Sequence, residues 1–275
     1  IKTKGDQIQH LSFDKIEGKG FFTKEIEDTL LRGEVDLAVH SMKDLPTESP
    51  EGLVIAGVSY RENPADGLVI NKGGEDASKI YKLKEGAIVG TSSARRKALL
   101  LDVRPDIEIK DIRGNVPTRL KKLKDGQFDA IVLAAAGLIR LEMPERIREF
   151  IAPEIMLPAN GQGAVGIECR SDDPRINALL APLTHEETSI RVRAERALNN
   201  RLNGGCQVPV AGFAELNGDQ LYLRGLIGFP DGSKIYRAEM TGSVNDAEAI
   251  GVAVAEDLLA QGGRSVLESI GIHVA

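Results

Sequence analysis

The pattern of apolar and polar positions divides the first part of the chain into short helices and strands. Residues 24–32 have the spacing of an amphipathic helix, Gly33 stands where such a helix ends, and residues 35–39 form an apolar run. The polar run 40–44 follows directly. We therefore predict a helix, a stop and a buried strand, with polar side chains where the strand ends.

The same order of helix, glycine and strand occurs a second time. The motif G-x-[VF]-D-[LA]-[AI]-V begins at Gly33 and again at Gly126, where it lies between a predicted helix over 119–124 and an apolar strand over 128–133. Such units are typical of parallel α/β folds. Two interpretations stay open, an ordinary likeness between two αβ units or a repeat of two similar lobes. A repeat predicts a ligand between the lobes, at the carboxyl ends of strands.

The last third of the chain has a different pattern. A long helix is predicted over 184–203, and strands in series are followed by helices, which indicates a separate α+β domain starting near residue 186. The predicted strands cover 208–216, 220–228 and 234–241, and the predicted helices cover 246–260 and 264–270.

Composition narrows the class of protein. The chain is 42% hydrophobic and 28% charged, so disorder is not expected. It contains no apolar run long enough for a membrane helix, and we expect no membrane partner. The two cysteines, Cys169 and Cys206, are too few for a disulfide scaffold and favour a reducing, cytoplasmic location. The four histidines are scattered without metal-ligand spacing, so no metal is expected.

The formal charge of −6 is unevenly distributed. Residues 91–124 contain ten basic and four acidic side chains, a net charge of +6, which leaves −12 for the remainder. Nucleic acid is a possible ligand for such a segment. However, the segment has no aromatic side chain for base stacking and the whole protein is acidic, so we expect no nucleic-acid partner.

Three arginines of this segment suit an anion. A Gly-Thr-Ser-Ser turn leads into a helix that starts with Arg95 and Arg96, and Arg113 follows a strand-like run. A helix N-terminus with guanidinium groups favours carboxylate or phosphate, which arginine binds in a bidentate manner. The alternative is solvated surface charge, and it is the better interpretation for the exposed helix face that carries Lys121, Lys122 and Lys124.

Two further residues have both a functional and a structural interpretation. Cys206 follows Gly204-Gly205 in a predicted helix-to-strand loop, where it is either an accessible thiol or a structural one. Asp44 ends a predicted strand before Leu45-Pro46, where it is either a cleft carboxylate or a turn residue. Cys169 lies in the strand-like run 164–169, and we expect it to be buried.

Five motifs occur in a characteristic order over nearly the whole chain. They are HSMKDLP at 40–46, GTSSARR at 90–96, RGN at 113–115, LPA with GQGA at 157–164, and GGCQVP at 204–209. In this order they resemble the porphobilinogen deaminase family. The resemblance implies two α/β lobes like those of periplasmic binding proteins and a C-terminal α+β domain with a three-stranded antiparallel sheet. We expect lobe 1 over 1–59 and 164–181, lobe 2 over 65–157, and the C-terminal domain over 186–275.

The resemblance also implies the chemistry. A monomeric transferase of tetrapyrrole (haem) biosynthesis would condense four porphobilinogen molecules head to tail, with release of ammonia, into 1-hydroxymethylbilane. The chain would grow on a dipyrromethane primer, the cofactor, attached through a thioether to Cys206. Asp44 matches the catalytic carboxylate of the family, which assists proton movement and stabilises positive charge on the pyrrole.

The carboxylates of primer and product explain the arginines, since each ring carries an acetate and a propionate. By resemblance, the cofactor-binding residues besides Cys206 are Ser41, Lys43, Thr91, Ser93, Arg95, Arg96, Arg113 and Asn115. The substrate-binding residues are Lys15, Lys19, Phe22, Arg119, Arg140 and Gln162. Lys15 and Lys19 lie in a glycine-rich run that resembles the family's mobile loop, and Phe22 suits a pyrrole ring or the core equally well. The family also has a strand and helix ahead of the position of Ile1, so we expect lobe 1 to be incomplete in this sequence.

A rival hypothesis from another class is a non-catalytic protein whose two lobes close on a carboxylate ligand. It explains the arginines and the repeat. It does not explain Cys206 in its GGCQVP setting or Asp44.

Overall fold

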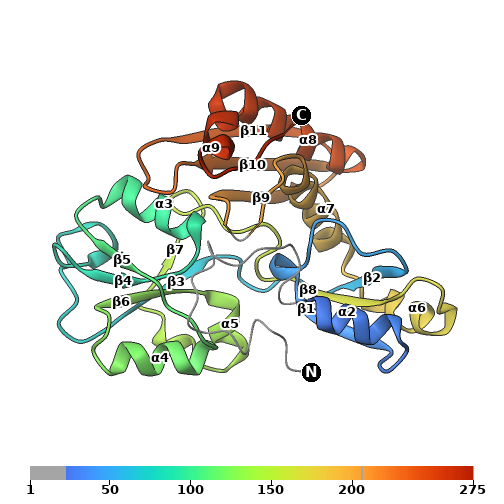
Figure 1. Ribbon diagram of the computed structural model, residues 1–275, viewed down its shortest axis with the longest axis horizontal. Coiled ribbons are helices and arrows are strands. Elements are labelled where there is room, and N and C mark those ends of the chain that lie inside the picture. The colour runs from blue at the N-terminus through green and yellow to red at the C-terminus, as the bar shows by residue number, and fades with distance from the viewer. Residues whose placement is uncertain (1–22, 206, 275) are drawn as a thin grey trace.

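The computed structural model describes residues 23–205 and 207–274. These residues form three bodies, each built on one β-sheet (Figure 1). We call them lobe 1, lobe 2 and the C-terminal domain.

Lobe 1 is a small antiparallel sheet with one helix near each side of it (Figure 1). The strand order is β1-β8-β2, and its elements are α2 (Lys24–Leu31), β1 (Leu37–Ser41), β2 (Leu53–Val58), β8 (Val165–Arg170) and α6 (Pro174–Leu180). The parallel arrangement expected from the repeat is wrong for these strands. The reason is that β8 returns from far downstream and pairs antiparallel with both β1 and β2.

Lobe 2 is a mixed five-stranded sheet with the order β5-β4-β6-β3-β7. Strand β4 runs parallel to its two neighbours, β5 and β6, whereas β3 is antiparallel to β6 and β7. Its strands are β3 (Asp66–Ile70), β4 (Ile88–Gly90), β5 (Glu108–Lys110), β6 (Ala130–Ala134) and β7 (Glu149–Ile151); its helices are α3 (Ala94–Val103), α4 (Val116–Lys124) and α5 (Ala135–Arg140). Gly126 follows α4 with φ 80° and Gly33 follows α2 with φ 71°, so both glycines of the repeat end a helix in the left-handed region.

The C-terminal domain has the three-stranded antiparallel sheet that the family resemblance implies. Three antiparallel strands lie in the order β11-β10-β9, and helices cover one face of this sheet (Figure 1). The elements are α7 (Glu186–Arg201), β9 (Val210–Asn217), β10 (Gln220–Gly228), β11 (Ile235–Ser243), α8 (Ala247–Leu258) and α9 (Arg264–Ser269). Gly251 lets α8 cross α7 closely, because a Cβ there would lie 2.3 Å from the Ala194 carbonyl oxygen.

The other face of the C-terminal sheet packs on lobe 2. Phe213 and Leu226 share one hydrophobic cluster with Leu99 and Leu100 of α3. The opposite face of the lobe 2 sheet is covered by α4 and α5, where Ile131 and its neighbours form a second cluster. Burial on both faces explains why the strands of this sheet are continuously apolar.

Strand ends of both lobes meet at the segments that connect the lobes. In lobe 1, β1 and β2 end, and β8 begins, at one edge of the sheet. In lobe 2, β4, β5, β6 and β7 end, and β3 begins, at one edge. The connections 59–65 and 152–164 run between these two edges. Side chains that follow the strands therefore gather where the lobes are joined.

Within the two described stretches, no helix has both the length and the apolar character needed to cross a membrane.

Candidate active site

Arg95 and Arg96 lie in the first turn of α3, just after β4 ends. Ser93 caps this helix, since its Oγ accepts from the Arg96 backbone N–H at 3.3 Å, and Thr91 Oγ1 accepts from the Ser93 backbone N–H at 3.2 Å. Both arginine side chains are buried, with relative exposures of 4% and 6%. The hydroxyls of the predicted turn thus build the helix start that places the two guanidinium groups.

A buried carboxylate that the sequence did not single out holds both arginines. Asp66, the first residue of β3, has no exposed surface. Its Oδ2 accepts from Arg95 Nη1 at 2.6 Å, and its Oδ1 accepts from Arg96 Nε at 2.8 Å. Despite burial, which raises it, the pKa of Asp66 is held well below its usual range by the Arg95 and Arg96 guanidinium groups.

Gln162 connects this cluster to lobe 1. The fully buried side chain donates from Nε2 to Asp66 Oδ1 at 3.1 Å and to the Pro64 carbonyl oxygen at 2.7 Å. Its Oε1 accepts from Lys43 Nζ at 3.3 Å. The predicted residues Lys43 and Gln162 are therefore brought together with the arginine pair, across the junction of the two lobes.

Burial and neighbouring charge shift the pKa of Lys43. Desolvation of the ammonium and the nearby Arg96 guanidinium lower it to about 8, although Asp44 and Asp66 act in the opposite direction. Lys43 therefore changes charge close to neutral pH.

Asp44 lies at the end of a short 3-10 helix, Met42–Asp44, directly after β1. Its side chain is exposed. The pKa values of Lys43, Arg96 and Arg119 are all lowered by burial, and the negative charge of Asp44 offsets part of this lowering. Asp44 is therefore within electrostatic reach of all three cations. One accessible carboxylate thus faces a group of positive charges.

Arg113 and Arg119 extend the cationic group. Burial lowers the pKa of Arg119, and the nearby Arg96 and Arg113 lower it further. Arg119 Nε donates to the Gly114 carbonyl oxygen at 2.7 Å. We define the cationic cluster as Lys43, Arg95, Arg96, Arg113 and Arg119; Asp44 and Asp66 are the carboxylates next to it.

Other predicted residues have different local positions. Asn115 caps α4, with its Oδ1 accepting from the Thr118 backbone N–H at 3.0 Å. Arg140 ends α5 and donates to the Gly163 carbonyl oxygen at 2.8 Å. Ser41 is exposed at the end of β1, on the opposite face from buried His40. The side chain of His40 points away from Ser41, and its Nε2 lies 3.2 Å from Oε2 of buried Glu168.

Four predicted residues, Lys15, Lys19, Phe22 and Cys206, lie outside the described residues. The described neighbours of Cys206 belong to the connection between α7 and β9, where the Val208 backbone N–H donates to the Gly205 carbonyl oxygen at 3.0 Å. Cys169 is buried in β8 as predicted, and burial raises the pKa of its thiol.

The sequence reasoning also missed the ion pair that supports the connecting segments. Arg61 and Glu195 are buried, and their side chains meet at 2.6 Å. Arg61 Nε donates to the Gln162 carbonyl oxygen at 2.8 Å, and Glu195 Oε2 accepts from the Gly161 backbone N–H at 2.6 Å. For Asp66, the available signal was an acidic residue at the start of the apolar run DGLVI. No comparable signal marks Glu195, because it lies among many charged residues of a long helix.

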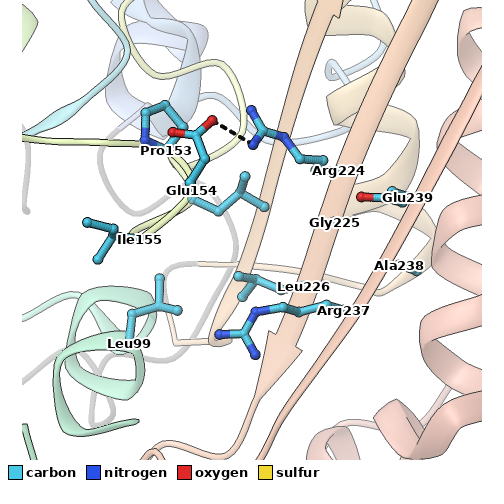
Figure 2. A pocket seen from close by; sticks show the side chains of 11 residues that line it. Leu99, Pro153, Glu154, Ile155, Arg224, Gly225, Leu226, Arg237, Ala238 and Glu239 are labelled. Carbon is cyan, nitrogen blue, oxygen red and sulfur yellow. Dashed lines mark hydrogen bonds and ion pairs between the residues drawn. The ribbon is translucent and has the colours of Figure 1, made fainter. Parts of the chain in front are cut away.

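A separate hollow lies between lobe 2 and the C-terminal sheet (Figure 2). It encloses about 280 Å³ and contains none of the predicted site residues. Arg224 on its wall is already paired with Glu154 at 2.9 Å and with Glu215 at 2.6 Å.

Among residues 23–205 and 207–274, no group of three or more His, Cys, Asp and Glu side chains is arranged to bind a metal.

The donor set of the cationic cluster fits a ligand with several carboxylates. Five cationic side chains face two carboxylates, so positive charge is in excess. Within the described part of the chain, Arg95 Nε is buried without a hydrogen-bond partner, so one donor inside the cluster is left unsatisfied. The fold and this site define an α/β protein with an excess of positive charge where its two lobes are joined.

Comparison with known proteins identifies the family. Residues 1–178 match the family model described as porphobilinogen deaminase, dipyromethane cofactor binding domain. Residues 189–260 match the model described as porphobilinogen deaminase, C-terminal domain. The chain belongs to the porphobilinogen deaminase family, as the sequence motifs predicted. It is an enzyme that polymerises porphobilinogen into hydroxymethylbilane with a dipyrromethane cofactor.

Solved structures with partial likeness include several binding proteins. YhfZ from Shigella flexneri is 20% identical with a TM-score of 0.29, over 62% of this chain and 74% of that one. A YaeC family lipoprotein from Enterococcus faecalis is 16% identical with a TM-score of 0.37, over 62% and 78%. The substrate binding protein of an amino acid ABC transporter is 18% identical with a TM-score of 0.32, over 61% and 69%. The assignment of the chain rests on the family models.

Proposed function

We propose that the cationic cluster holds the carboxylates of the dipyrromethane primer and of the growing chain. The observation that carries this is the excess of positive charge around Asp66 and Asp44. Arginine is suited to the task because its planar guanidinium binds a carboxylate through two parallel hydrogen bonds. Ser41, Thr91, Ser93, Asn115, Arg140 and Gln162 are proposed as supporting residues, and Lys15, Lys19 and Phe22 as further substrate contacts.

Asp44 is proposed as the catalytic carboxylate. The cofactor, when bound, would supply the pyrrole carbon to which the first porphobilinogen is joined, and each later unit would be joined to the last ring of the chain. Asp44 is accessible and lies within electrostatic reach of Lys43, Arg96 and Arg119, so a ring whose carboxylates pair with these cations would lie near it. A carboxylate in this position stabilises positive charge on the pyrrole when ammonia leaves and accepts the proton that the pyrrole carbon releases.

Cys206 is proposed as the attachment point of the primer through a thioether. Its support is the GGCQVP motif and its position in the chain between α7 and β9. We also propose that the protein acts as a cytoplasmic monomer without nucleic-acid or membrane partners and that it joins four porphobilinogen units. The proposed domains are lobe 1 over 1–59 and 164–181, lobe 2 over 65–157, and the C-terminal domain over 186–275. The net charge of −6 and the two cysteines support the part of this proposal that concerns partners and location.

The test is the intact mass of the denatured protein after expression in a host that makes porphobilinogen. We expect the mass of the polypeptide plus one dipyrromethane unit, and the polypeptide mass alone for Cys206→Ser. Cys169→Ser is the matched control and should retain the added mass, because Cys169 is buried in β8. Added mass in Cys206→Ser would contradict the assignment of the attachment point.

A further inference from the structure

Asp66 lies at the centre of the cationic cluster and is a further candidate for a role in the reaction. Its carboxylate receives hydrogen bonds from three side chains, those of Arg95, Arg96 and Gln162. None of its surface is exposed, so it does not itself contact a ligand in solution. Any effect on the ligand is therefore exerted through these three partners.

We propose that Asp66 is a positioning residue that presents Arg95 and Arg96 as a fixed pair to the carboxylates of primer and substrate. The inference rests on the proposed role of the cationic cluster. Consecutive residues on an α-helix point about 100° apart, so Arg95 and Arg96 would diverge if nothing held them. Both reach the same carboxylate, Arg95 with Nη1 and Nη2 and Arg96 with Nε and Nη2.

Backbone acceptors complete this arrangement. Arg95 Nη1 also donates to the Leu157 carbonyl oxygen at 2.8 Å, and Arg96 Nη1 donates to the Val132 carbonyl oxygen at 3.1 Å. With one negative charge shared between two guanidinium groups, the pair keeps a net positive charge. The single negative charge of Asp66 thus offsets part of the cost of burying two guanidinium groups, and the positive charge that remains attracts an anion.

Gln162 extends the role of Asp66 to the other lobe. Its amide connects Asp66 Oδ1 to Lys43 Nζ, and Lys43 precedes Asp44 in the chain. The arginine pair of lobe 2 and the turn that carries Asp44 in lobe 1 are therefore joined through one carboxylate and one amide. We infer that Asp66 sets the position of the anion site relative to Asp44.

The test compares Asp66→Asn with Asp129→Asn. An amide carries no negative charge and cannot accept hydrogen bonds through both of its terminal atoms, so Asp66→Asn loses both ion pairs and at least one hydrogen bond from an arginine. Asp129 is the matched control, because it accepts from the Ile88 backbone N–H at 2.8 Å and pairs with Lys84 in the same body, away from the cationic cluster. Asp66→Asn loses two ion pairs of lobe 2 and Asp129→Asn loses one, so the control shows what the loss of an ion pair in this body does to stability away from the cluster.

The readouts are the primer-loaded fraction from intact mass, and KM and kcat for porphobilinogen. For Asp66→Asn we expect a smaller loaded fraction and a KM raised about tenfold or more, with kcat per loaded molecule nearly unchanged. Partial unfolding would instead lower the apparent kcat and leave KM as it is. Unchanged KM and loaded fraction relative to Asp129→Asn would overturn the inference.

Two further variants keep the result interpretable. If Asp66→Asn does not fold, Asp66→Glu keeps the charge but shifts the carboxylate by one methylene, and an unchanged KM in that variant would likewise overturn the inference. Arg95→Leu tests the proposed anion site itself. If Arg95→Leu impairs loading and KM while Asp66→Asn does not, the role of Asp66 is wrong and the anion site stands; if neither does, the anion site is wrong as well.

Discussion

Arg61 and Glu195 form a buried, two-pronged ion pair between a connecting segment of the lobes and helix α7. Arg61 Nη1 donates to Glu195 Oε1 at 2.6 Å, and Arg61 Nη2 donates to Glu195 Oε2 at 3.1 Å. Glu195 also accepts from the backbone N–H groups of Gly161 and Ala214. A single carboxylate of the C-terminal domain thus supports the part of the 152–164 connection that carries Gln162.

Arg61→Met is expected to destabilise the fold by about 3–5 kcal/mol, because it leaves the Glu195 charge buried without its partner. Urea unfolding measures the loss. The control is Arg148→Met, since Arg148 pairs with Glu75 at a similar 2.6 Å but both side chains are about half exposed; its expected cost is about 0–1 kcal/mol. Equal losses in the two variants would show that burial of the Arg61 pair does not matter.

Asp44→Asn is expected to lower turnover about 100-fold or more while the primer stays attached. The amide keeps the shape of the side chain but neither carries negative charge nor accepts the proton. Single-turnover assays on protein of verified primer content measure the effect. Glu48→Gln, an exposed acid shortly after Asp44, is the control and should turn over normally. Near-normal turnover of Asp44→Asn would refute its catalytic role.

The pH dependence of kcat/KM is expected to report Lys43. Below its pKa of about 8 the ammonium is charged and attracts substrate carboxylates, and above that pH the attraction is lost. We therefore expect kcat/KM to fall as the pH rises through about 8. Lys43→Arg keeps its charge throughout this range and should flatten the alkaline side of the profile. An identical alkaline side in wild type and Lys43→Arg would contradict this assignment.

Glu27→Gln is expected to stabilise the protein at neutral pH, by on the order of 1 kcal/mol. Burial raises the pKa of Glu27 above its usual 4.5, and Glu168 raises it further. Among the residues that the structure describes, none forms a hydrogen bond with Glu27 Oε1. Stability contributed by the protonated form is present below that usual pKa and is lost as the pH rises through the raised value. The gain of the variant should therefore be larger at pH 7 than at pH 4.

Urea unfolding at the two pH values measures this difference. The control is Glu34→Gln, because Glu34 is exposed beside Arg32, which lowers its pKa. That variant should show a small pH effect of the opposite sign. A gain for Glu27→Gln that does not grow with pH would show that its carboxyl is not desolvated in the folded protein.

Local patterns in the sequence predicted much of the framework. The C-terminal strands and helices follow from apolar periodicity and turn residues, which are properties of neighbouring positions. Ser93 before Arg95 and Arg96 is a local cap, so the start of α3, where we propose the anion site, was predictable too. The family was recognisable because its motifs are short continuous segments.

The tertiary structure alone decided how these segments meet. The antiparallel pairing of β8 with β1 and β2 contradicts the parallel arrangement expected from the repeat, because pairing depends on a strand that is distant in the sequence. Asp66 and Arg95 are 29 residues apart, and Arg61 and Glu195 are 134 residues apart. Periodicity describes which face of an element is apolar, whereas the partner of a buried charge is determined by which distant element folds against it.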